Sequence, residues 1–293
     1  MVETGNHENI ELLVSEYIYP INQFGRMGQI QAVFDGSFNV KVKDQIIHFA
    51  SYKGYISGHG LYLPREVYGK IRPYLKVGNR VRITDNQITF YSLQEILTFD
   101  YDEKVIDQQI DHVDTNATLI SQVTQAYKEA TKQGLRIGLN NQDVTFKNIQ
   151  DLLIKGDFNP TNLNLIVSYL VGRGRGLTPS GDDMLVGYLS LMWQFAPERA
   201  KLLAQKLKEV HLSTTDVSRA YLLAATERHF STPLFKYYQA VTALYEGREN
   251  DLRDLEAKIS WIMKVGHTSG QDMTYGIGLG IGYLNNKAIK IES

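Results

Sequence analysis

The chain has 293 residues, which at about 150 residues per domain predicts two ordinary domains or one large one. Hydrophobic residues make up 43% and charged residues 22%, so the composition is globular and excludes disordered and collagen-like classes. The 31 basic and 32 acidic residues nearly balance. This disfavours a broad nucleic-acid surface, because phosphate binding needs a clustered excess of Lys and Arg.

The absence of cysteine excludes disulfides, thiolate nucleophiles, iron–sulfur clusters and cysteine-ligated zinc. The first residues show no basic segment followed by an apolar one, the pattern of a secretory signal. The two longest apolar stretches, Leu163–Val171 and Met184–Phe195, are shorter than the ~18 residues that a membrane-spanning helix needs. We therefore expect a soluble cytoplasmic protein with no membrane partner and no nucleic-acid partner.

Residues 1–100 are predicted to form a β-rich domain, barrel-like or a meander sheet, that opens with an amphipathic helix over Asn9–Tyr19. Over Gln29–Phe49 hydrophobic and polar residues alternate, and Asp35-Gly36 marks the first turn. A second hairpin is predicted around Asp85-Asn86.

From about residue 115 the hydrophobic period becomes helical, and 115–293 is predicted to be an α-helical domain. Residues 101–114 are acidic and aromatic, which favours a solvated connector over a metal site. The predicted helices are Thr115–Lys132, Asn162–Val171, Ser180–Phe195, Pro197–Val210, Thr215–His229, Pro233–Tyr245, Asn250–Val265 and Ser269–Asn285. The predicted fold class is therefore α+β, with the β-rich domain first.

The most informative segment is a glycine-rich loop that runs into a helix start, Gly-Arg-Gly-Arg-Gly-Leu-Thr-Pro-Ser-Gly-Asp-Asp over residues 172–183. Two caps fit it: Thr178 with Pro179 at the first helical position, or Ser180 with Asp183 closing a capping box. Backbone N–H groups left free at such a start attract anions. A capped helix after a flexible loop is the plainer interpretation.

A near copy of this segment follows ninety residues later as Gly-His-Thr-Ser-Gly-Gln-Asp-Met-Thr-Tyr-Gly over residues 266–276. With one gap at Pro179, the identical pairs are Gly176/Gly266, Thr178/Thr268, Ser180/Ser269, Gly181/Gly270, Asp183/Asp272, Met184/Met273 and Gly187/Gly276. The repeat predicts two equivalent Ser-Gly-x-Asp helix starts, related by an internal pseudo-twofold, that meet in one shared site. The alternative is a duplicated packing device in which the glycines let helices approach closely.

These two motifs, with Ser213-Thr214-Thr215-Asp216 between them, resemble the AllH-like family, formerly a domain of unknown function. The resemblance runs from the β-rich region through the helical one, and its Leu-Thr-Pro-Ser-Gly-Asp-Asp string is specific. The family is named after a subunit associated with oxamate carbamoyltransferase, which interconverts oxalurate plus phosphate with oxamate plus carbamoyl phosphate in allantoin breakdown. The resemblance implies an accessory or catalytic subunit that acts with other subunits.

The sequence departs from the related patterns in two respects. Arg173 and Arg175 stand in the first loop, where the family usually has neutral residues. The Ser-Thr-Arg-Thr-Arg and His-Pro-x-Gln signatures of aspartate- and ornithine-type carbamoyltransferases are absent, so any such activity needs a different site.

A small, planar anion such as oxamate, oxalurate or carbamoyl phosphate is well held by guanidinium groups and converging backbone amides. Asp183 and Asp272 would repel such an anion unless a hard cation such as Mg²⁺ lies between, so both are candidate catalytic residues and candidate metal ligands. His267 is a candidate proton carrier, or merely a loop histidine. The candidate ligand-binding residues are Arg173, Gly174, Arg175, Gly176, Thr178, Ser180, Gly181, Thr215, Thr268, Ser269 and Gly270.

Three functions remain open at this point. The chain is a carbamoyltransferase-type subunit, a metal-dependent hydrolase that uses Asp residues at helix starts, or a non-catalytic assembly subunit whose motifs only pack helices. A second copy of the chain is a further candidate partner. No P-loop, G-x-G-x-x-G or G-x-S-x-G motif is present.

Overall fold

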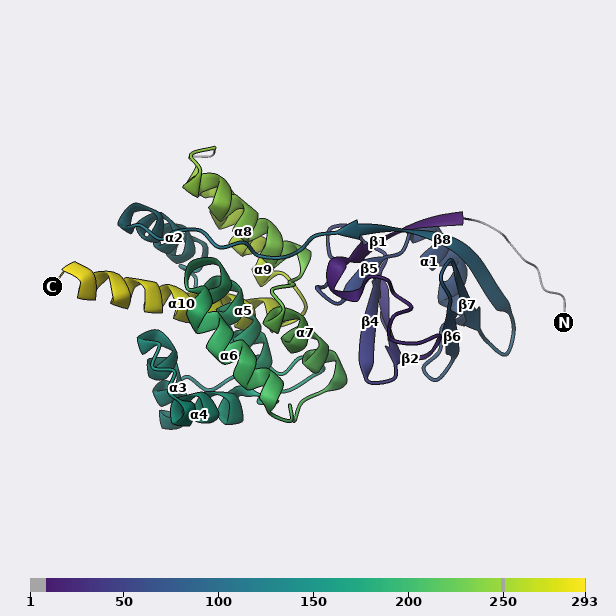
Figure 1. Ribbon diagram of the computed structural model, residues 1–293, viewed down its shortest axis with the longest axis horizontal. Coiled ribbons are helices and arrows are strands. Elements are labelled where there is room, and N and C mark those ends of the chain that lie inside the picture. The colour runs from purple at the N-terminus through teal and green to yellow at the C-terminus, as the bar shows by residue number, and fades with distance from the viewer. Residues whose placement is uncertain (1–8, 249–250, 293) are drawn as a thin grey trace. The chain divides into compact units, whose positions relative to one another are not determined.

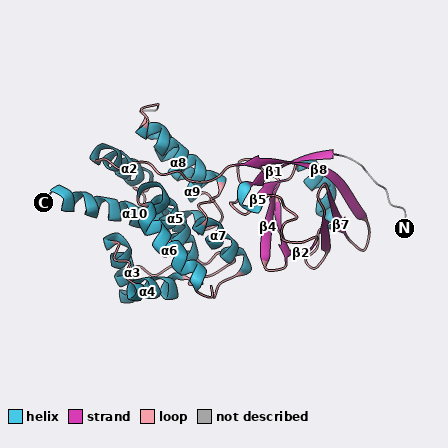
Figure 2. Cartoon of the chain, viewed as in Figure 1, coloured by secondary structure: helices cyan, strands magenta, loops and turns pink. Residues whose placement is uncertain are grey.

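The computed structural model describes residues 9–248 and 251–292 (Figure 1). The chain divides into two compact units, the first ending at Gln108 and the second beginning at Gln109. The first is a β-barrel and the second is helical, as the colouring by secondary structure shows (Figure 2). The predicted α+β class, with the β-rich part first, is confirmed.

The barrel closes in the strand order β1-β5-β4-β3-β2-β6-β7-β8. Its strands are β1 (Asn9–Ser15), β2 (Met27–Val33), β3 (Ser37–Val42), β4 (Gln45–Ala50), β5 (Gly60–Tyr62), β6 (Arg80–Ile83), β7 (Gln87–Tyr91) and β8 (Ile96–Ile106), and the helix α1 (Arg65–Ile71) lies between β5 and β6. The hairpins β2–β3, β3–β4 and β6–β7 are antiparallel, which confirms the predicted turns at Asp35-Gly36 and Asp85-Asn86. Parallel pairing of β8 with β1 completes the closure.

The predicted opening helix is wrong, because Asn9–Ser15 is strand β1. Its buried residues Ile10, Leu12 and Val14 alternate with exposed or half-buried ones, and that two-residue period belongs to a strand. The predicted connector is also corrected. Residues 101–106 belong to β8, where Phe99 and Tyr101 are buried while the intervening Asp100 is not.

The rest of the predicted connector, residues 109–114, lies on the helical unit. Ile110 and Val113 are buried in its core, and their backbone N–H groups donate to Arg228 and Gln194. Asp111, between these two buried side chains, and Asp114, directly after them, are exposed.

The helical unit comprises α2 (Ala117–Ala130), α3 (Val144–Lys155), α4 (Pro160–Leu170), α5 (Ser180–Phe195), α6 (Pro197–Glu209), α7 (Asp216–Thr226), α8 (Thr232–Tyr245), α9 (Leu252–Met263) and α10 (Ser269–Glu292). The prediction for α5 matches both ends, whereas α3 was not predicted. Every residue of α5 is buried, so this helix forms the centre of the unit (Figure 1). No helix in the described part of the chain has the length and apolar character to cross a membrane.

Candidate functional site

The two helices that begin with the repeated motif pack directly on each other. A Cβ atom added to Gly187 of α5 would lie 1.9 Å from the carbonyl oxygen of Met273, and one added to Gly276 of α10 would lie 2.0 Å from that of Met184. Because Gly187 pairs with Gly276 and Met184 with Met273 in the repeat, the two contacts are equivalent. The helix backbones therefore touch at a locally twofold crossing that only glycine permits.

The glycines in the first turn of α5 and α10 make the same kind of close backbone contact, each with the helix that precedes its own. A Cβ on Gly181 would lie 2.1 Å from the carbonyl oxygen of Leu170 at the end of α4, and one on Gly270 would lie 2.0 Å from that of Ile262 near the end of α9. Each helix start is thus fixed against the helix that precedes it. The pairs α4–α5 and α9–α10 are two copies of one helix–loop–helix unit, and the repeat includes a packing device.

Neither of the two predicted caps forms. The N-cap of α5 is Pro179, which makes no side-chain cap hydrogen bond, and the loop instead satisfies the amide of Gly181 through the carbonyl of Arg173 at 2.8 Å. In α10 the equivalent amide of Gly270 donates to Val265 at 2.9 Å. The amides of Ser180 and Ser269 are left without a hydrogen-bond partner in the described part of the chain. The two starts therefore offer one free amide each.

The two helix starts exchange side-chain contacts. The hydroxyls of Thr178 and Ser269 lie 2.7 Å apart and close to the Asp183 carboxyl. In the opposite direction the Ser180 hydroxyl lies close to Asp272. Each motif therefore places its serine beside the aspartate of the other. The two motifs therefore lie in contact with each other, as the repeat predicts.

The two aspartates are deeply buried, with exposed fractions of 5% for Asp183 and 0% for Asp272. Burial raises the pKa of the Asp183 carboxyl well above its ordinary range against hydrogen bonds from Ser269 and Thr178, and the neighbouring charge of Asp272 adds to the rise. Burial likewise raises the pKa of Asp272, opposed by hydrogen bonds from Gly138 and Ser180. Burial therefore disfavours the charged form of both carboxyls.

One oxygen of each of these two carboxyl groups lacks a hydrogen-bond partner. Oδ2 of Asp183 and Oδ2 of Asp272 are buried and have no hydrogen-bond partner among the described residues. Buried carboxyl oxygens are normally satisfied, because an unmet one costs about 1–3 kcal/mol. The two unpartnered atoms lie at equivalent positions of the duplicated motif.

The residues directly before the two aspartates, Asp182 and Gln271, accept hydrogen bonds from other segments of the chain. Asp182 accepts hydrogen bonds from the amide of Gly172 at 2.8 Å, from the hydroxyl of Ser218 at 2.6 Å, and from the hydroxyl of Thr214. Its counterpart Gln271 accepts from the amide of Arg136 at 2.6 Å. These two side chains therefore tie neighbouring segments to the helix starts.

The loop residue Gly138 was missed from the sequence. Its amide donates to Oδ1 of Asp272 at 3.0 Å, and a Cβ there would lie 2.0 Å from the Ser180 hydroxyl. Gly138 stands 134 residues before Asp272 in the chain and outside either motif. The Gly-x-x-x-Gly spacing of Gly134 and Gly138 signals a turn, but nothing local assigns it to this site.

The loop residues predicted to bind ligand are only partly brought to the carboxyl pair. The Arg173 side chain is engaged elsewhere, because its Nε donates to the Tyr169 carbonyl and its guanidinium stacks 3.9 Å over the Tyr169 ring. Arg175 and His267 are exposed. Thr215 is the N-cap of α7, where its hydroxyl accepts from the Ser218 amide and donates to the Leu177 carbonyl.

The remaining predicted ligand-binding residues have backbone roles. Gly174 and Gly176 have positive φ angles of 130° and 90°, which the loop turns require. The Thr268 carbonyl accepts from the amides of Gln271 and Asp272 and so opens α10. Their contribution to a site lies in shaping the two helix starts.

The oxygen atoms around Asp183 and Asp272 are of the kind that bind hard cations. The groups around the pair are carboxylate and hydroxyl oxygens, which Mg²⁺ prefers, and two buried carboxyl oxygens are unused. Over the described residues no cluster of three or more His, Cys, Asp or Glu side chains is suited to a metal ion. Asp183 and Asp272 could therefore hold Mg²⁺ only with water or a ligand completing its coordination, and when bound it would neutralise the paired carboxylates.

The fold and site together define a class: a β-barrel unit joined to a helical unit in which two glycine-bearing helix starts exchange serine and aspartate contacts. The family model described as oxamate carbamoyltransferase subunit AllH matches residues 170–281, less than half of the chain but including both starts. This match supports an AllH-like family assignment and confirms the resemblance read from the motifs. At this coarser level it supports a carbamoyltransferase-associated subunit, and its description as a subunit points to further subunits. No solved structure matches the chain.

Proposed function

We propose that this chain is a subunit of a carbamoyl-transferring assembly and that its paired helix starts bind a small carbamoyl-bearing anion such as oxamate, oxalurate or carbamoyl phosphate. The observation that carries the proposal is the pair of buried, unpartnered Oδ2 atoms of Asp183 and Asp272. The family match to an oxamate carbamoyltransferase subunit supplies the ligand class.

The chemistry of these ligands suits the paired groups. All three carry an NH₂ group on a carbonyl carbon at one end and negative charge at the other. An ionised aspartate accepts from the NH₂ group, while a protonated carboxyl donates to a carbonyl or carboxylate oxygen. Because burial raises the pKa of both carboxyls, one of them can hold a proton while the other is ionised, and the two then offer both functions.

The anionic end of the ligand needs donors. The unpartnered amides of Ser180 and Ser269 supply two. The exposed Arg175 adds positive charge on the loop before α5, where it can attract an anion from solution.

The role of the two aspartates is tested by the variants Asp183→Asn and Asp272→Asn. Each removes an ionised acceptor and, because burial disfavours its charge, we expect the ligand-free variants to melt at the same temperature as the parent or higher. We also expect them to lose the thermal shift that oxamate, oxalurate or carbamoyl phosphate, each with and without Mg²⁺, produces in the parent. Differential scanning fluorimetry measures both quantities.

Asp254→Asn is the matched control. Asp254 also lies in the first turn of a helix, α9, but its side chain is 43% exposed and pairs with Lys258. This variant should keep the ligand shift. The measurements use the chain alone and the chain with any protein that co-purifies in constant ratio. Absence of a ligand shift in both parent samples, or its retention in both Asn variants, would overturn the proposal.

A further inference from the structure

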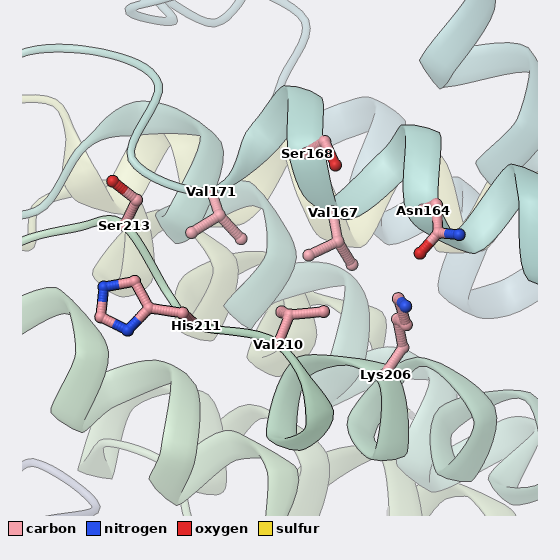
Figure 3. A pocket seen from close by; sticks show the side chains of 8 residues that line it. All are labelled: Asn164, Val167, Ser168, Val171, Lys206, Val210, His211 and Ser213. Carbon is pink, nitrogen blue, oxygen red and sulfur yellow. The ribbon is translucent and has the colours of Figure 1, made fainter.

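A cavity lies in the helical unit, between α4 and the end of α6. Its volume is about 230 Å³, and Figure 3 shows the side chains that line it. The lining residues are Asn164, Val167, Ser168, Val171, Lys206, Val210, His211 and Ser213. At about 30 Å³ per water molecule the cavity has room for roughly seven waters, which is the size of a small organic molecule.

The lining has an apolar middle and two polar ends. Figure 3 shows Val167, Val171 and Val210 between the helices, with Lys206 and Asn164 towards one end and His211 and Ser213 towards the other. None of the lining residues in this part of the described chain is acidic. A ligand that matches this pattern has a short hydrocarbon body and polar groups at both ends.

Lys206 is the one cationic side chain of this lining that is always charged, and it therefore favours a negatively charged ligand. Two other lysines of α6 have ion-pair partners, Lys201 with Glu198 and Lys208 with Glu227. Lys206 has no hydrogen bond or ion pair among the described residues, and its side chain extends toward the space below α4 in Figure 3. A half-buried lysine with no carboxylate beside it is suited to a carboxylate supplied by a ligand.

The other polar side chains of the cavity are also uncommitted. Asn164, Ser168, His211 and Ser213 make no side-chain hydrogen bond within the residues that the structure describes. Lys206 lies in α6, whereas His211 follows the end of that helix at Glu209, and Figure 3 shows their side chains at opposite ends of the cavity.

We propose that this cavity is a binding site for a short organic acid that places a carboxylate on Lys206, its carbon chain on the valines, and a second hydrogen-bond acceptor beside His211 and Ser213. This inference is independent of the proposed function, because the cavity contains neither Asp183 nor Asp272. The cavity does adjoin segments that hold Asp182, since Val171 precedes Gly172 and Ser213 precedes Thr214.

Three probes of similar size separate the contributions: glutarate with two carboxylates, butyrate with one, and uncharged glutaramide. In isothermal titration calorimetry on the full chain we expect glutarate to bind best, butyrate more weakly, and glutaramide at least tenfold more weakly than glutarate. The order follows from charge pairing at Lys206 and from a second acceptor at the far end.

Two substitutions locate the binding. Lys206→Met keeps the length and apolar stem of the side chain and should lower glutarate affinity at least tenfold, whereas Lys201→Met on the exposed face of the same helix should change it less than twofold. Val210→Phe should fill the cavity and abolish binding. No glutarate binding by the parent, or equal binding by the parent and the Lys206 variant with an unchanged melting temperature, would refute the proposal.

Discussion

Acidification should unfold the barrel unit because of two histidines buried in it. His48 and His59 have exposed fractions of 8% and 1%, and the Nδ1 atom of His48 lies 3.3 Å from the hydroxyl of the buried Ser57. Burial lowers the pKa of His48 from 6.5 to about 4. Burial, together with the nearby His48, lowers the pKa of His59 from 6.5 to about 3. Both side chains are therefore neutral in the folded protein across the physiological range.

The direction of the effect follows from proton linkage. Below pH 6.5 the unfolded chain takes up a proton on each histidine while the folded chain does not, so stability is full above pH 6.5 and falls with pH until the folded-state pKa values are reached. At pH 5 the low pKa of each histidine lowers the free energy of unfolding by about 2 kcal/mol relative to its value above pH 6.5. The two together remove about 4 kcal/mol, a large part of the 5–15 kcal/mol typical of a domain.

The assay must report on the barrel alone. Both tryptophans, Trp193 and Trp261, lie in the helical unit, so their fluorescence follows that unit. Urea unfolding at pH 7.5 and pH 5 is therefore read by a brief deuterium pulse at fixed pH and mass spectrometry of β3 and β4 peptides. We expect the free energy of unfolding of these strands to fall by about 4 kcal/mol between the two values.

Variants separate the histidines from other titrating groups. His48→Asn keeps a polar group near the Nδ1 position, and both this variant and His59→Asn should reduce the pH dependence by about 2 kcal/mol each. His267→Asn, which replaces an exposed histidine of the helical unit, should leave the pH dependence of the barrel unchanged. An unchanged pH dependence in both barrel variants would show that the buried histidines do not carry the acid sensitivity.

Two predictions concern the crossing of α5 and α10 and the hydrogen bonds that Asp182 accepts. Gly187→Ala and Gly276→Ala should each lower the free energy of unfolding of the helical unit by about 3 kcal/mol or more, measured by urea unfolding with tryptophan fluorescence, because the new methyl group meets backbone rather than a movable side chain. Gly69→Ala in α1, where no atom lies within 4 Å of the added carbon, should leave the barrel as stable or about 1 kcal/mol more stable, and a similar loss there would contradict the argument. Asp182→Asn should destabilise the protein by about 1–3 kcal/mol, because its amide nitrogen would face a donor such as Ser218, and a melting temperature equal to the parent's would refute this.

The sequence by itself determined the elements whose signals are local. The bounds of α5 follow from Pro179 before it and Pro197 after it, and the turn at Asp35-Gly36 from its residue types. The repeated helix start was also readable, because Ser-Gly-x-Asp-Met recurs with identical spacing from Ser180 and from Ser269.

Only the tertiary structure decided the features that depend on distant neighbours. Asn9–Ser15 is a strand because β8, about ninety residues later, provides its hydrogen bonds, and a short amphipathic segment cannot reveal that partner. Gly138 joins the candidate site for the same reason.

The two aspartates of the repeat show the division most clearly. The sequence placed Asp183 and Asp272 at equivalent positions, but it could not distinguish a surface charge that complements a helix dipole from a buried acid. Burial against the opposite helix start decides this, because it removes water from the carboxyls and raises their pKa values. Desolvation depends on every chain segment that covers a group, and so it belongs to the folded molecule rather than to any one motif.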